Sequence, residues 1–177
     1  SISYSSESAR NAPLIETFSP QSNIKVISET TGYSGYFNMF PDEDGVVRWI
    51  PAVLKCRESL YAPLSIVTIS AFLDSQPSVQ LYEYGVGEIK IGDMSIPTDE
   101  IGRIIINYRG PGKTFPHIPV TDILKGEADA KLIKDKIVLI GATAVGVYDL
   151  RVTPFSNVFP GLEIHANVID SILGIDL

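Results

Sequence analysis

The sequence predicts an α/β fold: a mixed sheet with a parallel core, an antiparallel hairpin portion and flanking helices. Short β-branched runs between glycines fill residues 79–106, and the apolar run 136–140 is typical of a strand buried on both faces. Pro160 and Gly161 then open an apolar-periodic helix. With 177 residues, 45% of them hydrophobic, we expect one domain at 23–177, preceded by a polar, flexible lead-in or remnant of a truncated part at 1–22.

The first half of this domain is predicted to contain a hairpin and a helix. Residues 23–31 indicate a short helix or strand. The aromatic and β-branched runs 36–40 and 46–50 flank the acidic turn 41–45, so we expect them to pair as antiparallel strands. Pro63 fits the first turn of a helix, because it has no backbone N–H to leave unpaired. A meander of short strands is predicted next, over residues 79–84, 88–91 and 95–96.

The second half is predicted to contain a parallel crossover. Residues 102–108 are apolar enough for a strand covered on both faces. Thr121 or Asp122 can cap a short helix that ends at Gly126. A strand at 136–140 would then lie parallel to the earlier one and feed the last helix.

Charge and cysteine content exclude several classes of partner. The formal net charge is −7 and the pI is near 4.8, whereas nucleic acids and anionic membrane surfaces attract clustered Lys and Arg. The single cysteine, Cys56, cannot form an intrachain disulfide. No apolar run reaches the roughly 18–20 residues that span a bilayer. The chain starts without methionine and stops directly after a helix, so we expect an excised piece of a longer protein.

The candidate ligand-binding residues surround the end of the predicted strand 136–140. Asp149, Arg151 and Thr153 lie in the loop that follows it, where ligands often bind in α/β sheets. His165 and Asn167 lie on the last helix, within reach of that loop. The alternative is a bracing role, in which Asp149 caps a turn and pairs with Arg151 while His165 hydrogen-bonds to the loop.

No catalytic residue, metal or cofactor is predicted. The loop 141–146 lacks the middle glycine of a dinucleotide fingerprint and the Gly-Lys-Ser/Thr ending of an ATP-type loop. His165 has no second histidine one helical turn away, as a zinc site of the metalloprotease kind requires. Residues 42–45 fit a turn better than a calcium loop. Cys56 lies in a predicted strand without a histidine partner.

An ordered set of short motifs gives a family resemblance. The motifs are Gly35-Tyr-Phe-Asn38, Asp42-Glu-Asp-Gly-Val-Val-Arg48, Pro63-Leu64, Phe115-Pro116, Asp122-Ile-Leu-Lys-Gly126, Lys136-Ile-Val-Leu-Ile-Gly-Ala-Thr-Ala144, Asp149, Thr153-Pro154 and Pro160-Gly-Leu-Glu-Ile-His-Ala-Asn167. In this order they resemble the second type of CHASE domain (Cyclases/Histidine kinases Associated Sensory Extracellular). The resemblance covers about residues 33–174. One departure is that family members usually carry an additional N-terminal α/β portion, which residues 1–23 are too short and polar to supply.

The resemblance implies an extracytoplasmic sensor, periplasmic or extracellular, of a bacterial membrane receptor. Its output would be an adenylate or guanylate cyclase, a histidine kinase, a serine/threonine kinase or a cyclic-dinucleotide enzyme. It implies a small-molecule or envelope signal, a homodimer and membrane helices that flank this chain. Two alternatives stay open: a soluble α/β enzyme with acid/base residues Asp149 and His165, and a periplasmic protein-interaction module.

Overall fold

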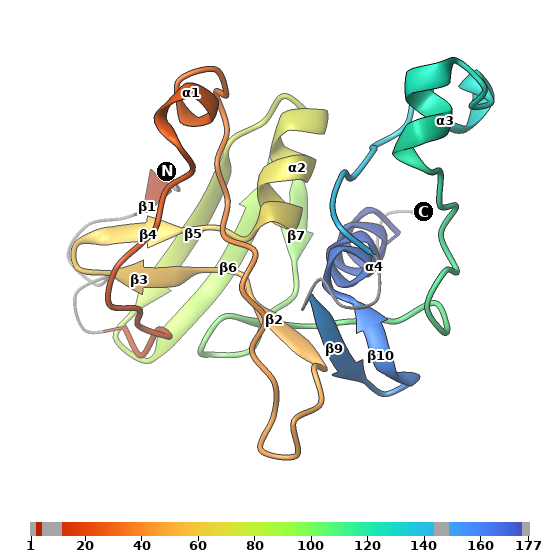
Figure 1. The fold of residues 1–177 in the computed structure, drawn as a ribbon. Coiled ribbons are helices and arrows are strands. Elements are labelled where there is room, and N and C mark those ends of the chain that lie inside the picture. Colours follow the sequence, from red (N-terminus) through yellow and green to blue (C-terminus); the bar gives the residue numbers. More distant parts are fainter. Residues whose placement is uncertain (1–2, 5–11, 144–148, 175–177) are drawn as a thin grey trace.

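The computed structural model describes residues 3–4, 12–143 and 149–174. Its largest sheet is the predicted meander, with β5 (Pro77–Tyr82), β6 (Gly85–Ile91) and β7 (Met94–Ile96) antiparallel in that order (Figure 1). The short strand β1 (Ser3–Tyr4) pairs in parallel with the outer edge of β5. Buried and exposed positions alternate along β5, so one face of the meander covers the core and the other faces solvent.

Three further sheets in the described part of the chain are two-stranded and antiparallel. They pair β2 (Trp49–Pro51) with β8 (Arg103–Ile105), β3 (Leu54–Cys56) with β4 (Ser59–Tyr61), and β9 (Leu150–Thr153) with β10 (Ser156–Pro160). The sheets therefore mix with helices in a single α/β arrangement, as the sequence predicts. Cys56 is a buried, free thiol at the end of β3.

Two helices pack against each other and against the strands. They are α2 (Leu64–Phe72), which starts directly after Pro63, and α4 (Gly161–Leu173), which starts directly after Pro160. Both starts confirm the proline signals in the sequence, because proline has the extended backbone that precedes a helix. The predicted element at 23–31 is the short helix α1 (Lys25–Ser28). The described chain also contains α3 (Val120–Lys125) and one turn of 3₁₀ helix at Ala130–Leu132.

The core joins both helices to the inner face of the meander. Its fully buried members include Ile50, Ile66, Ile69, Leu81, Ile89, Phe159, Ile164 and Ile172. Ala12 and Leu14 also lie in this core, although they belong to the segment expected to be a flexible lead-in. The domain boundary at residue 22 stays a prediction.

The prediction of a buried strand at residues 136–140 is wrong. This segment forms no strand: Ile137 and Leu139 pack against the core, but Val138 is exposed and Ile140 is 86% exposed. A parallel crossover requires about a dozen residues or more, usually with a helix that covers the sheet. Here the intervening helix α3 has six residues, none of them buried. The parallel core is therefore not found in the described residues, and Ile105 of β8 is exposed rather than covered.

The predicted hairpin before α2 forms only at its turn. The Asp42 N–H donates to the Val46 carbonyl at 2.9 Å, and Gly45 has a φ of +81°, which favours glycine. Residues 36–40 are not a strand, however, because Tyr36 pairs instead with the chain at Pro63. This pairing carries residues 31–37 across the molecule towards α2 and α4 (Figure 1).

Capping of α3 differs from the prediction at one end. Its N-cap is Pro119, without a side-chain bond, whereas a cap by Thr121 or Asp122 was expected. Those two side chains lie inside the helix, where Thr121 bonds to Asp122. The predicted end at Gly126 is confirmed, with a left-handed φ of +73°.

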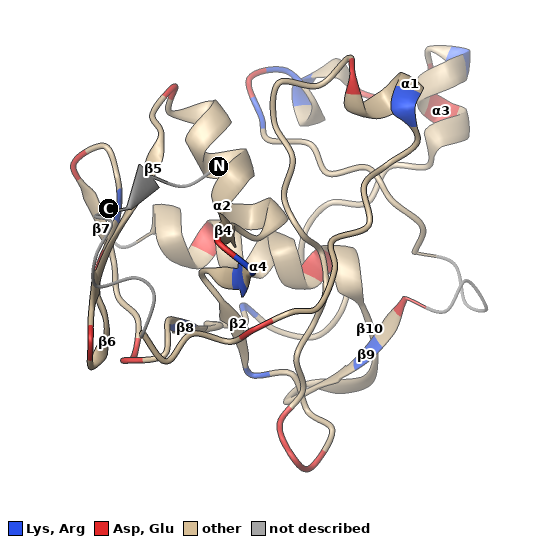
Figure 2. Cartoon of the chain, turned by 90° about the vertical axis from the view of Figure 1, so that its left-hand side faces the viewer, with Lys and Arg blue, Asp and Glu red and all other residues tan. Residues whose placement is uncertain are grey.

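The acidic turn 41–45 is stabilised by the side chain of Arg48. Arg48 contacts Asp42 at 2.8 Å and Asp44 at 2.7 Å, and it lowers the pKa of Asp44 to about 2. The indole N–H of Trp49 donates to Asp42 at 2.7 Å. Elsewhere in the described chain Lys and Arg are scattered over separate elements (Figure 2).

Candidate functional site

The first turn of α4 is built around the Asp149 carboxylate. The Gly161 N–H donates to the Asp149 carbonyl at 2.9 Å. A Cβ atom at position 161 would lie 2.5 Å from the Asp149 carboxylate, so only glycine lets this group approach the helix so closely. The N-terminal end of a helix carries partial positive charge, which favours a carboxylate there. Asp149 is thus fixed beside the start of α4.

One helical turn further along, His165 is buried with only a weak hydrogen bond, to the Phe37 backbone. His165 is 2% exposed, and neither ring nitrogen makes a hydrogen bond of ordinary geometry to a described residue. Burial lowers the pKa of His165 below its ordinary value, although the nearby Phe37 backbone and Asp149 act in the opposite direction. The imidazole is therefore neutral at pH 7. Buried polar groups are nearly always well paired, so this weakly paired ring requires an explanation.

Asp149 and His165 line one pocket of about 400 Å³. Residues of the 31–37 segment form the opposite wall, with Thr31, Tyr33 and Ser34 as polar members and Phe37 as an aromatic one. Leu64, Ile140 and Leu162 add an apolar surface. The volume lies in the range of small-molecule sites, about 300–1,000 Å³, and the mixture of apolar walls with a few polar groups is typical of them.

The other three predicted site residues lie outside this pocket lining. Arg151 lies on β9, 3.4 Å from the Asp149 carboxylate, while its Nε atom is buried without a partner in the described chain. Thr153 donates to the Ser156 carbonyl at 3.3 Å and so closes the β9–β10 hairpin. Arg151 and Thr153 thus lie on a strand, whereas a loop was expected.

Asn167 points away from the pocket, because residues two apart on a helix face about 200° apart. Its side-chain oxygen accepts from the Arg109 N–H at 3.0 Å, and its amide donates to the Glu163 carbonyl at 2.8 Å. Asn167 therefore braces α4 against the chain that follows β8. Its assignment as a ligand contact stays a prediction, as do those of the other four residues.

Sequence reasoning missed the 31–37 wall and a buried acid. Glu163 accepts from the Lys113 N–H at 2.8 Å, and His117 lies 3.5 Å from the same carboxylate. The position of Glu163 among the apolar residues of the last helix was the signal in the sequence that could have indicated its burial. Part of the glycine loop 141–146 lies outside the described residues, so that loop cannot be placed as a whole. Within the described chain, no group of three metal-ligating side chains is found.

One comparison with known proteins identifies the family of the chain. A family model described as the CHASE2 domain matches residues 3–176. The chain therefore belongs to the CHASE2 family, an extracellular sensory domain family of signalling receptors, and its family role is sensory rather than catalytic. No curated protein and no solved structure matches it. Across the part of the chain that the structure describes, no helix has the length and apolar character required to cross a membrane.

We expect the neutral, buried His165 to make stability depend on pH. Because its pKa is lower in the folded chain, the unfolded chain binds more protons below about pH 6.5. The contribution of His165 to the free energy of unfolding is thus fully present above that pH. It is lost as the pH falls towards the folded-state pKa, at up to about 1.4 kcal/mol per pH unit. Urea unfolding at several pH values should give a shallower dependence for His165→Gln than for the wild type. Identical slopes for the wild type and His165→Gln would contradict the prediction.

Proposed function

We propose that this chain is the extracytoplasmic sensor of a bacterial transmembrane receptor and that a small molecule binds in the pocket between Asp149, His165 and the 31–37 wall. The single observation that carries the proposal is the buried, only weakly paired imidazole of His165 at the pocket. Membership of an extracellular sensory family supports the same role.

The chemistry of the pocket favours a compact ligand with an apolar part and a hydrogen-bonding group. A buried polar group left wholly unpaired costs about 1–3 kcal/mol, and the weak bond to Phe37 offsets only part of this cost. A ligand that forms a good hydrogen bond with His165 would therefore stabilise the folded domain. The neutral imidazole can donate from one nitrogen and accept at the other. Phe37, Leu64 and Leu162 offer an apolar surface for the rest of the molecule.

Transmission would proceed through α4, because its first turns form part of the pocket. Gly161, Leu162 and His165 line the site, while the same helix continues to Leu173 at its far end. A ligand shifts an equilibrium only by binding one conformer more tightly than another. A change at His165 would therefore alter how α4 packs on α2, and membrane helices flanking this chain would carry that change to the output. A homodimer and a cyclase or kinase output belong to the proposal.

A thermal-shift screen tests the pocket. We would heat the chain with individual amino acids, amines, organic acids, nucleotides and divalent metals, since a ligand specific to the folded state raises the apparent stability by mass action. A compound that raises the Tm of the wild type should lose its effect with His165→Gln and Asp149→Asn. His117→Gln and Asp93→Asn, which change the same residue types elsewhere, should respond as the wild type does.

Two outcomes would count against the proposal. Retention of the full shift in both pocket variants would move binding to another place. Loss of stability in His165→Gln and Asp149→Asn, together with no shift by any compound in the wild type, would favour a bracing role for both residues.

A further inference from the structure

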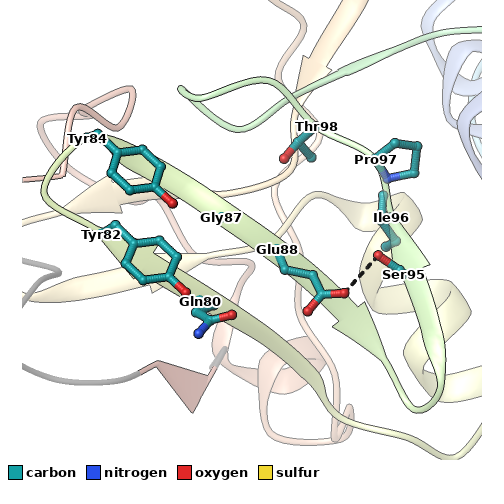
Figure 3. Close-up of a pocket in the computed structure, with 9 residues that line it drawn as sticks. All are labelled: Gln80, Tyr82, Tyr84, Gly87, Glu88, Ser95, Ile96, Pro97 and Thr98. Carbon is teal, nitrogen blue, oxygen red and sulfur yellow. Dashed lines mark hydrogen bonds between the residues drawn. The ribbon is translucent and has the colours of Figure 1, made fainter.

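A second groove lies on the outer face of the meander, away from the Asp149 and His165 pocket. It has a volume of about 390 Å³ and is lined from three consecutive strands and the segment after β7 (Figure 3). The inner face of the same strands carries the buried core residues Leu81 and Ile89. An outer face of this kind needs only to be polar, yet here it bears two aromatic rings.

Tyr82 and Tyr84 form an aromatic platform in this groove by stacking face to face, so only the outer faces of the stack can contact a ligand. Their ring centroids are 5.0 Å apart and the rings are within 8° of parallel. Tyr84 is 62% exposed, so the stack is not hidden in the core. Figure 3 shows both rings on the same side of the hairpin as Gln80 and Glu88.

Gly87 provides the space that Tyr82 occupies. A Cβ atom at position 87 would lie 2.3 Å from Cε2 of the Tyr82 ring. Gly87 is not among the glycines with positive φ, so its backbone conformation does not require glycine. The ring therefore lies where a side chain at position 87 would otherwise be, close against β6.

Hydrogen-bonding groups surround the platform. The Ser95 hydroxyl donates to Glu88 at 3.1 Å, and the Lys90 ammonium lies 3.0 Å from the other oxygen of Glu88. The charge of Glu88 is thus already balanced. Among the described residues, the side chains of Gln80 and Thr98 make no hydrogen bond, so their donors and acceptors are available.

This combination selects one class of ligand. The Lys90 ammonium beside the lining is already paired with Glu88, so a phosphate or a carboxylate would gain little from it. The single carboxylate is already paired, so a free amine gains little from it. Rings of pyranose sugars have a flat C–H face that packs on an aromatic ring, and their hydroxyl groups match amide and hydroxyl partners. We infer that this groove, built on Tyr82 and Tyr84, binds a neutral carbohydrate.

Titration with three neutral hexasaccharides, cellohexaose, maltohexaose and hexa-N-acetylchitohexaose, tests this inference. Calorimetry should give a Kd at or below about 1 mM for at least one of them. Tyr84→Ala should weaken that binding about tenfold, because the exposed ring of the platform is lost. Tyr61→Ala removes a partly exposed tyrosine from β4 and should bind as the wild type does. His165→Gln should also bind normally, which separates this groove from the other pocket.

Three results would overturn the inference. The first is the absence of binding by all three saccharides to the wild type at about 5 mM. The second is unchanged binding by a correctly folded Tyr84→Ala chain, judged by its circular dichroism. The third is tighter binding of adenosine or uridine than of any saccharide, with Tyr84→Ala abolishing it, because the platform would then recognise a base.

Discussion

Phe159→Ala is expected to lower the free energy of unfolding by about 3–5 kcal/mol. The Phe159 side chain is 0% exposed and lies at the end of β10, directly before α4. Its ring meets the Tyr108 ring edge-on, with centroids 5.5 Å apart at 80°. Tyr108 in turn donates to the Val47 carbonyl at 3.0 Å. Removing the ring leaves a cavity where the last hairpin, the chain after β8 and α4 meet.

Chemical unfolding followed by circular dichroism measures this loss. Phe72→Ala deletes the same side chain from a position on α2 that is 57% exposed, and it should change the stability by less than about 1 kcal/mol. Since a whole domain is stable by about 5–15 kcal/mol, Phe159→Ala can approach complete unfolding. Phe159→Leu keeps most of the volume and should lose about 1.5 kcal/mol or less. Equal losses for Phe159→Ala and Phe72→Ala would mean that Phe159 does not anchor α4.

Local patterns predicted those parts of the fold that local chemistry decides. The meander follows from apolar alternation between glycines, and α2 and α4 follow from a proline before an apolar-periodic run. The turn 41–45 and the end of α3 at Gly126 were predicted because each needs a glycine with positive φ. These features depend on a few neighbouring residues and on little else in the chain.

The run 136–140 failed because a strand also needs a partner. Its apolar content is that of a buried strand, but no neighbouring strand among the described residues offers it a ladder of hydrogen bonds. The alternation survives in the packing of Ile137 and Leu139, which face the core, while Val138 and Ile140 face outwards. Composition therefore predicted burial on both faces, whereas only Ile137 and Leu139 are partly buried, and it could not supply the pairing.

The sequence predicted one side of the candidate site but not the other. Asp149 and His165 were expected near each other because a loop and the next helix must be adjacent, and both line one pocket. The opposite wall lies more than 100 residues earlier in the chain, as Thr31 and Phe37 show, and it reaches α4 through the pairing of Tyr36 with Pro63. Such a non-local contact leaves no periodic pattern. Asn167 lies two positions beyond His165, and only the helical geometry reveals that it faces the other way.

Gly85→Ala is expected to lower the free energy of unfolding by about 3–5 kcal/mol, through two separate effects. Gly85 has a φ of +138°, which side-chain-bearing residues rarely adopt. A Cβ atom there would also lie 1.9 Å from the Glu100 carbonyl oxygen. That oxygen accepts the Val86 N–H at 2.7 Å, so the segment 97–100 cannot move away without breaking this bond.

Two matched glycines separate these effects. Gly32 has open space and no positive φ, so Gly32→Ala should be neutral or slightly stabilising. Gly45 has a φ of +81° but open space around it. Gly45→Ala should therefore lower the free energy of unfolding only by the cost of the left-handed backbone conformation, about 1–2 kcal/mol. If Gly85→Ala lost no more than Gly45→Ala, the segment 97–100 would be free to retreat. The larger loss is expected because the Val86–Glu100 bond holds this segment against the hairpin, and the same bond would fix the Thr98 side of the proposed carbohydrate groove relative to Tyr84.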